Sequence, residues 1–481
     1  MKKFVIMGLL AGLLSAWLPP VPEKAAEPET GEKIFYCTDT KKPLDAGEET
    51  SNAAISKVPQ DSDFEIDADG VLVKYHGTEE VVTVPDGVTR IGENAFWGNT
   101  SIQKVLLPDT VTEIEGSAFG RCFNLNAVEG GNVTRIGAYA FYSSSIQEID
   151  LSKAKIIEKG TFDDCRMLEE VNLETVEVLG DEVFWGCRNL KTVTGLEHLR
   201  EIGYAVFLST PLWENYWKDE TRGELWIVNG ILIMGHAGTG TVVIPDHVTR
   251  IAPCAFRSGN CFESKLEKVI IPDSVTEIGS SAFAYCSNLT TVRMEDSVKK
   301  IERWGFEACM KLADVRLSNA LTDIDYVFSY CKALERLTLP ASLEKLGEHA
   351  FEHCTKLKTL TIPPQLKEFA DEVNIVNYSK PLAQTIYVTD ISEAKKLEGA
   401  IEKCGARAAE LRLAEENVVL GIGSKFALRF NSGAKAERWR SSNKKIVAVD
   451  SVGNLYAVST GTATITATIY GKEYKCKVTV K

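Results

Sequence analysis

The sequence predicts a mainly β fold, in which a solenoid in two segments is followed by a C-terminal β-sandwich. A phenylalanine returns at intervals of 21 to 23 residues, apart from one interval of 49 and one of 27, which predicts the solenoid. A long stretch beginning at Asp69 recurs 160 residues later without a gap, which predicts two segments. Short runs of alternating polarity after about residue 411 predict the sandwich.

The repeated unit is clearest from Ile278 to Lys300, and the chain holds eleven copies of it. An Ile or Leu stands shortly before each repeat phenylalanine, and a stretch of the form L-x-x-V-x-L follows it. The alternation at the end of that stretch, as in Leu289, Val292 and Met294, is typical of a short strand with one face inward. One such strand cannot bury its apolar face alone, whereas stacked neighbours form a continuous core and a parallel sheet. The repeat phenylalanines lie at positions 96, 119, 141, 162, 184, 207, 256, 283, 306, 328 and 351.

The motif "IGSSAFAYCSNLTTVRM" and the predicted hairpin followed by "VVIPDHVTRI" resemble the BspA-type leucine-rich repeat family over roughly residues 64 to 370. This resemblance implies a leucine-rich-repeat solenoid in an extracellular, surface-associated protein. It also implies binding to other proteins, although no spacing in the sequence identifies a ligand.

The C-terminal segment "WRSSNKKIVAVDSVGNLYAVSTGTATITATI" resembles the bacterial immunoglobulin-like domain of group 2. The resemblance implies an immunoglobulin-like β-sandwich, which packing must hold together because no Cys…Trp…Cys pattern is present. Just before it, "IYVTD" predicts a strand, and residues from about 392 to 404 predict a helix that covers the last rung of the solenoid.

The N-terminus carries two lysines, an apolar run from Phe4 to Leu18 and then a polar stretch, which is the pattern of a secretory signal. We therefore expect a secreted, extracellular protein, either released or retained at the cell surface, with no membrane span once the signal is removed. The predicted organisation is a signal peptide (1–26), a linker (27–63), a first array (64–212), a hairpin insert (213–240), a second array (241–370), a cap or linker (371–410) and the sandwich (411–481).

A formal net charge of −13 excludes nucleic acid and anionic membrane as natural partners, because both require an electropositive surface. We find no motif for nucleophilic, nucleotide-dependent or metal-dependent catalysis and no identifiable carboxylate pair. The sequence therefore predicts a protein that is not an enzyme, uses no cofactor or metal and is a monomer.

Seven of the twelve cysteines follow a repeat phenylalanine by three positions. Equivalent positions in a solenoid stack in parallel about one strand spacing apart, so these thiols do not converge as a disulfide or a zinc site requires. We interpret them as small buried residues, in a position that Asn99 and Ser144 fill in other rungs. A disulfide between Cys254 and Cys261, in the longest unit, remains an alternative. The seven are Cys122, Cys165, Cys187, Cys286, Cys309, Cys331 and Cys354.

The residues between the inward positions of the strands are predicted to line the concave face of the solenoid, its largest continuous surface. An acidic row in the first array is followed by a basic row in the second, which predicts a charge-matched groove, although solvated strand faces would give the same pattern. The acidic row is Glu129, Glu148, Asp150 and Glu170, and the basic row is Arg293, Arg316 and Arg336.

Two further sets of residues admit a functional and a structural interpretation. Exposed rings in the insert, Trp213, Tyr216, Trp217 and Trp226, could stack on sugars or anchor a protein, or they could pack the insert onto the solenoid. His349 and His353 have the i, i+4 spacing of two metal ligands on a helix, but they flank an inward phenylalanine and are expected at the outer surface.

The function that the sequence favours is a non-enzymatic adhesion or binding protein that engages an extracellular protein or glycan through the solenoid face. The alternative is a structural strut in a surface assembly.

Overall fold

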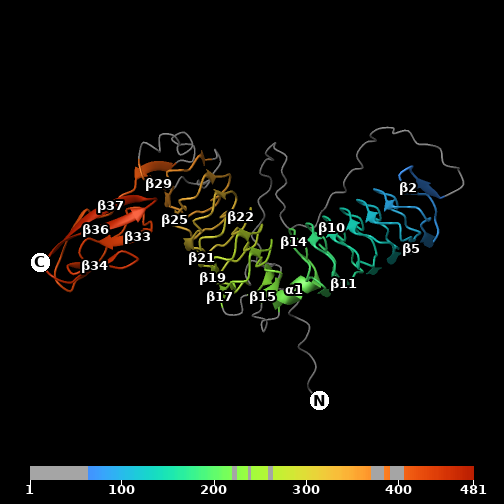
Figure 1. The fold of residues 1–481 in the computed structure, drawn as a ribbon, viewed down its shortest axis with the longest axis horizontal. Coiled ribbons are helices and arrows are strands. Elements are labelled where there is room, and N and C mark those ends of the chain that lie inside the picture. Colours follow the sequence, from blue (N-terminus) through green and yellow to red (C-terminus); the bar gives the residue numbers. More distant parts are fainter. Residues whose placement is uncertain (1–62, 219–224, 237–239, 258–263, 370–383, 391–405) are drawn as a thin grey trace, which may run out of the picture. The chain divides into compact units, whose positions relative to one another are not determined.

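A computed structural model describes residues 63–218, 225–236, 240–257, 264–369, 384–390 and 406–481 (Figure 1). Their regular secondary structure consists of short strands joined by turns, apart from one α-helix, α1 (Pro211–Lys218). The predicted signal peptide, the helix expected near residues 392 to 404 and Cys261 lie outside the described residues, as does the predicted linker except for Asp63.

The first array is built from two kinds of strand, as the repeat predicts. Each rung, one turn of the solenoid, contributes a two-residue strand to one sheet. It contributes a second, usually longer strand to the other side, where the strands form two parallel sheets, β3-β5-β7-β9 and β11-β13. A hairpin, β1 with β2, opens the first of these sheets. The strands of that sheet are β1 (Phe64–Ile66), β2 (Val71–Tyr75), β4 (Arg90–Ile91), β6 (Glu113–Ile114), β8 (Arg135–Ile136), β10 (Ile156–Ile157), β12 (Val178–Leu179) and β14 (Glu201–Ile202). The longer strands are β3 (Val81–Thr83), β5 (Lys104–Leu107), β7 (Ala127–Gly130), β9 (Glu148–Ile149), β11 (Glu170–Asn172) and β13 (Thr192–Thr194).

The second array repeats this arrangement after a second hairpin, β15 with β16. On its short-strand side are β15 (Leu225–Val228), β16 (Ile231–Gly235), β18 (Arg250–Ile251), β20 (Glu277–Ile278), β22 (Lys300–Ile301), β24 (Asp323–Ile324), β26 (Lys345–Leu346) and β28 (Glu368–Phe369). On its long-strand side are β17 (Thr241–Val243), β19 (Lys268–Ile271), β21 (Thr291–Met294), β23 (Asp314–Arg316), β25 (Arg336–Thr338), β27 (Thr359–Thr361), β29 (Gln384–Val388) and β30 (Ala406–Glu410).

The register of the short strands follows the repeat. Ile91 pairs with Ile114, and Ile114 pairs with Ile136, so equivalent aliphatic side chains lie one above the other. These isoleucines are 0 to 1% exposed, because the alternation of a strand turns one side chain of each pair inward. Each rung is therefore joined to its neighbours alone, by backbone hydrogen bonds and by the packing of equivalent residues.

The repeat phenylalanines form two columns of stacked rings in the core, as predicted. All eleven are at most 3% exposed. Neighbouring ring centroids are 4.8 to 5.8 Å apart in the first array and 4.9 to 6.0 Å apart in the second. Tyr75 packs at a tilt against Phe96 at one end of the first column, and Trp226 stacks on Phe207 at the other.

The β15–β16 hairpin joins the cores of the two arrays. Ile231, Ile233 and Met234 belong to the hydrophobic cluster of the first array, whereas Leu232 belongs to that of the second. Strand β16 then pairs in parallel with β18, the first short strand of the second array. The hairpin thus contributes apolar side chains to the hydrophobic clusters of both arrays.

The strand predicted at "IYVTD" is observed as β29, which pairs in parallel with β27. Strand β30, which we did not predict, pairs with β29 and extends the same sheet. The immunoglobulin-like sandwich follows. One of its sheets has the order β31-β37-β36-β33 and the other β32-β35-β34, around a separate hydrophobic cluster. Its strands are β31 (Asn417–Leu420), β32 (Lys425–Ala427), β33 (Arg438–Ser441), β34 (Val447–Val449), β35 (Asn454–Ala457), β36 (Gly461–Ile469) and β37 (Lys472–Val480).

Candidate binding surface

The outward side chains of the long strands form the surface on which the sequence places its candidate binding residues. In β5 the inward residues Val105 and Leu107 are buried, and Lys104 and Leu106 between them are half-buried. Strand β19 has the same pattern. Because neighbouring long strands are paired in register, each outward position continues from one rung to the next as a row.

The acidic row of the first array is mostly uncompensated. Glu129 forms an ion pair with Lys104, with 2.7 Å between Oε1 and Nζ. Glu148 and Glu170 are exposed, and their side chains form no hydrogen bond or ion pair with any residue that the structure describes. Asp150 is also exposed and accepts a hydrogen bond of 2.8 Å from the backbone N–H of Ser152, which lowers the pKa of its carboxyl group. The carboxylates of Glu148 and Glu170 are therefore free to meet cations from a partner, and that of Asp150 is partly compensated by Lys153.

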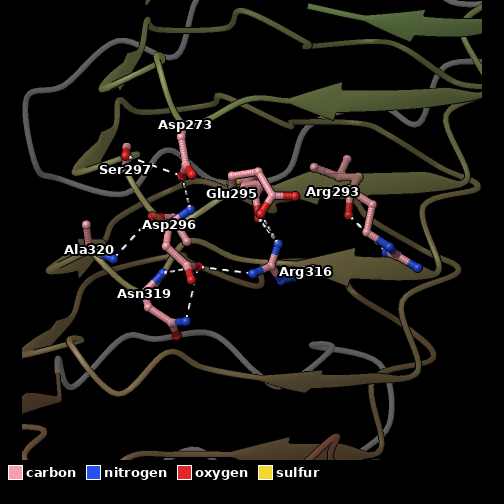
Figure 2. A network of polar contacts seen from close by, with 11 residues as sticks. Asp273, Arg293, Glu295, Asp296, Ser297, Arg316, Asn319 and Ala320 are labelled. Carbon is pink, nitrogen blue, oxygen red and sulfur yellow. Dashed lines mark hydrogen bonds and ion pairs between the residues drawn. The ribbon is translucent and has the colours of Figure 1, made fainter. Parts of the chain in front are cut away.

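Two arginines of the basic row, Arg293 and Arg316, form ion pairs with carboxylates of neighbouring residues (Figure 2). Arg293 on β21 forms an ion pair with Asp314 on β23. Arg316 donates to Glu295 Oε2 at 2.9 Å and to Asp296 Oδ1 at 3.2 Å. The first pair can be recognised from the repeat. Asp314 stands at the outward position equivalent to that of Thr291, so it lies one rung away from the strand that carries Arg293.

Arg336, the last residue of the basic row, lies against the C-terminal sandwich. A Cβ atom added to Gly433 would come within 2.3 Å of Arg336 Nη1, so a larger residue would displace the end of that side chain, and the φ of 75° at Gly433 favours glycine. Nearby, Thr359 Oγ1 donates to the carbonyl of Ser432 at 3.3 Å, and Lys435 Nζ lies 3.3 Å from Asp314 Oδ1. Arg293 and Arg316 therefore already have acidic partners within the chain, whereas Arg336 is exposed and lies close to Gly433.

The aromatic residues of the insert lie mostly in the core. Trp213 and Tyr216 on α1 are 8% and 7% exposed, and the Tyr216 hydroxyl donates to the carbonyl of Met234 at 3.3 Å. Trp226 on β15 stacks on Phe207 with 5.8 Å between the ring centroids. The side chain of Trp217 lies outside the described part of the chain. The three described rings fit the packing interpretation and do not form an exposed platform for a ligand.

The seven repeat cysteines are buried free thiols, as predicted. Each also donates a hydrogen bond to the carbonyl of the phenylalanine in the preceding rung, a role that we did not predict. The distance is 3.1 Å from Cys122 to Phe96 and 3.2 Å from Cys331 to Phe306. Burial raises the pKa of Cys122 to about 12, so the thiol remains protonated and unreactive at neutral pH. The same geometry relates the remaining five pairs, Cys165–Phe141, Cys187–Phe162, Cys286–Phe256, Cys309–Phe283 and Cys354–Phe328.

His349 and His353 lie on a turn and not on a helix, with φ angles of 48° and 56°. Their rings stack on Tyr326 and Tyr330 of the preceding rung, with centroid separations of 4.7 and 4.3 Å. Glu352 lies 3.3 Å from His349 Nδ1 and 3.7 Å from His353 Nε2. Among the described residues, no three His, Cys, Asp or Glu side chains converge as a metal site requires. The pair belongs to a ladder of stacked rings.

Comparison with protein families identifies the repeat. The model of the BspA type leucine rich repeat region matches residues 89–213 and 258–377 in six copies, which together are just over half of the chain. The chain belongs to the BspA type leucine rich repeat family. In this family member, the model of the bacterial Ig-like domain (group 2) also matches residues 427–480.

Several solved bacterial structures are similar to this BspA type chain. A leucine rich cell surface protein from Faecalibacterium prausnitzii is 23% identical, covers 72% of this chain and 98% of its own, and has a TM-score of 0.43. A leucine-rich repeat protein from Bacteroides ovatus is 18% identical, with 76% and 100% covered and a TM-score of 0.34. The pneumococcal vaccine antigen PcpA is 16% identical, with 71% and 91% covered and a TM-score of 0.35.

No curated protein matches the chain at a significant level. Among the residues that the structure describes, no helix has the length and apolar character needed to cross a membrane.

Proposed function

We propose that this BspA type protein is a secreted or surface-displayed, non-enzymatic binding protein, and that the long-strand face of its first array engages a protein partner that carries basic groups. The observation that carries this proposal is the difference between the two rows of charge. Glu148 and Glu170 have no cationic partner among the described residues and Asp150 has only Lys153 nearby, whereas Arg293 and Arg316 are already paired.

The two rows differ in how strongly they attract a charged partner. A carboxylate that already faces an arginine gains little from a second cation, because its charge is compensated. An uncompensated row attracts a basic partner, speeds its association and rejects acidic competitors. The apolar run from Phe4 to Leu18 and the family both support export to the cell surface, where such partners would be met.

The test is capture of extracellular proteins by the purified, immobilised protein at low salt, with the captured proteins identified by mass spectrometry and then purified. We expect the variant Glu148→Lys/Asp150→Lys/Glu170→Lys to lose a partner that the wild type binds, and the binding to weaken as salt is added. The matched control is Arg293→Glu/Arg316→Glu, which changes charge on the same kind of face and should keep that partner.

Two outcomes would contradict the proposal. If the acidic-row variant keeps every partner, or if only the arginine variant loses one, the binding face lies elsewhere. If no face variant changes capture and the protein fractionates within a large surface assembly, the hairpin that packs into both arrays would favour the structural strut.

A further inference from the structure

An open hollow lies on the first array beside the long-strand sheet. Its volume is about 290 Å³, and four successive rungs contribute to it. We call it the amide hollow, because four of its seven lining residues carry carboxamide groups and none carries a charge. The lining residues are Gln103, Phe123, Asn124, Asn126, Ser145, Gln147 and Met167.

Three of the carboxamides are available to a ligand. Gln103, Asn126 and Gln147 are exposed, and their side chains form no hydrogen bond with any described residue. Asn124 differs, since its Nδ2 donates to the carbonyl of Thr100 at 2.6 Å and holds the turn in place. A free carboxamide presents two N–H donors and a carbonyl acceptor side by side, which suits a hydroxyl group that both donates and accepts.

Comparison of equivalent positions in successive rungs shows whether the fold requires a carboxamide at this position. Gln103, Asn126 and Gln147 each stand immediately before a long strand, so they occupy one equivalent position in three successive rungs. The next two rungs carry charged residues at this position, Glu169 and Lys191. Since the position does not demand a carboxamide for folding, three neutral amides in succession point to a ligand.

Phe123 gives a second, independent indication. It directly follows Cys122, and its ring is 53% exposed, so it contributes little to the core. In the six other rungs with a repeat cysteine, the residue after that cysteine is never aromatic: these residues are Arg166, Arg188, Ser287, Met310, Lys332 and Thr355. An exposed ring beside free hydrogen-bonding groups suits a ligand that has both C–H and O–H surfaces.

We propose that the amide hollow binds a neutral oligosaccharide. One sugar ring packs on Phe123, and the carboxamides of Gln103, Asn126 and Gln147 bind hydroxyl groups of that and adjoining sugars. The absence of charge in the lining disfavours uronic or sialic acids, which would be desolvated there without a cation. This site differs from the acidic row in position and in ligand, so it goes beyond the function proposed above.

The test uses the full-length protein on a printed array of neutral and acidic oligosaccharides, followed by calorimetric titration with the neutral hexaose that binds best. We expect binding to neutral saccharides only. We also expect Phe123→Ala and the double variant Gln103→Ala/Gln147→Ala each to raise Kd by about tenfold or more. The matched control is Ile156→Ala, which removes an exposed apolar side chain, 38% exposed, from the short-strand sheet and should leave Kd unchanged.

Each other outcome overturns the inference. The inference is wrong if no neutral saccharide binds on the array or if acidic saccharides bind better. It is also wrong if Phe123→Ala binds neutral saccharides as the wild type does and has an unchanged melting temperature. A peptide that binds here in place of saccharides would also overturn it. The acidic-row variant Glu148→Lys/Asp150→Lys/Glu170→Lys separates the two proposals. It should lose the basic protein partner but still bind the saccharide. If only one of the two binding assays fails, only the proposal that it tests is contradicted.

Discussion

The thiol of Cys309 donates a hydrogen bond of 3.2 Å to the carbonyl of Phe283, one rung earlier in the solenoid. Both side chains are fully buried, so this carbonyl has no access to water. The bond links the small residue of one rung to the backbone of the preceding rung, and it recurs at all seven repeat cysteines.

Replacement of Cys309 by alanine should therefore cost more than the small loss of volume suggests. The carbonyl of Phe283 keeps only the longer bond from the N–H of Cys286, at 3.3 Å, and we expect Cys309→Ala to lower the free energy of unfolding by about 1 to 3 kcal/mol. Cys309→Ser keeps a donor and should cost less, about 1 kcal/mol, as the buried Ser144 at the equivalent position suggests. Urea unfolding measures both, and equal costs would contradict a role for the hydrogen bond.

The buried thiols also predict a loss of stability in alkali. Burial raises the pKa of Cys165 and Cys286 from 9.0 to about 12. The folded protein thus holds these protons at a pH where the unfolded chain releases them, so the stabilisation is complete below pH 9 and is lost as pH rises toward 12. We expect the melting temperature to fall across this range, and to fall less steeply in Cys165→Ser/Cys286→Ser. Parallel slopes for the wild type and the variant would show that other groups cause the loss.

The phenylalanine columns should be the most sensitive part of the core. Phe306 is fully buried between Phe283 and Phe328, and its ring centroid lies 4.9 and 5.7 Å from theirs. Phe306→Ala should cost about 3 to 5 kcal/mol, whereas Phe123→Ala, at an exposed ring, should change stability by less than about 0.5 kcal/mol. Thermal melts of the two variants make the comparison. An equal loss of stability in both variants would mean that the stacked phenylalanines do not stabilise the core more than an exposed ring does.

The C-terminal sandwich should depend on Tyr470 for its attachment to the second array. The Tyr470 hydroxyl donates to the carbonyl of Leu339 at 2.7 Å and lies 3.3 Å from that of Thr361. Desolvation raises its pKa, so the hydroxyl remains a donor at all ordinary pH values. Tyr470→Phe should cost about 1 kcal/mol and speed proteolytic release of the sandwich. Tyr456→Phe, which removes a hydroxyl within the sandwich, should not change the rate of release.

The spacing of phenylalanine and isoleucine was sufficient to predict the solenoid, the inward residues and the buried cysteines, because a repeated unit can bury its apolar residues only against its neighbours. The hydrogen bonds of the thiols were not predictable in this way, since they depend on how far the backbone of one rung lies from the next. The positions of Trp213 and Tyr216 depend on how α1 packs, which the local pattern does not reveal.

The candidate surface was predicted less well than the fold. Outward positions were identified correctly from the alternation in strands such as β5 and β19. Whether a charge there is free depends on neighbours in adjacent rungs and on the sandwich, as the contacts of Arg316 and Arg336 illustrate. The amide hollow was missed because its residues are separated by a full turn, and only comparison of equivalent positions reveals them.

The pairing of every rung with the one before and the one after has an evolutionary consequence. Removal of residues 278–300 as a block would place the turn of Phe306 on that of Phe256, with ring, aliphatic residue and thiol again meeting their counterparts. Loss of a single residue inside a strand would instead turn its apolar side chains toward water. Genes for such chains can therefore lengthen or shorten by whole units through recombination, while smaller insertions are confined to the turns.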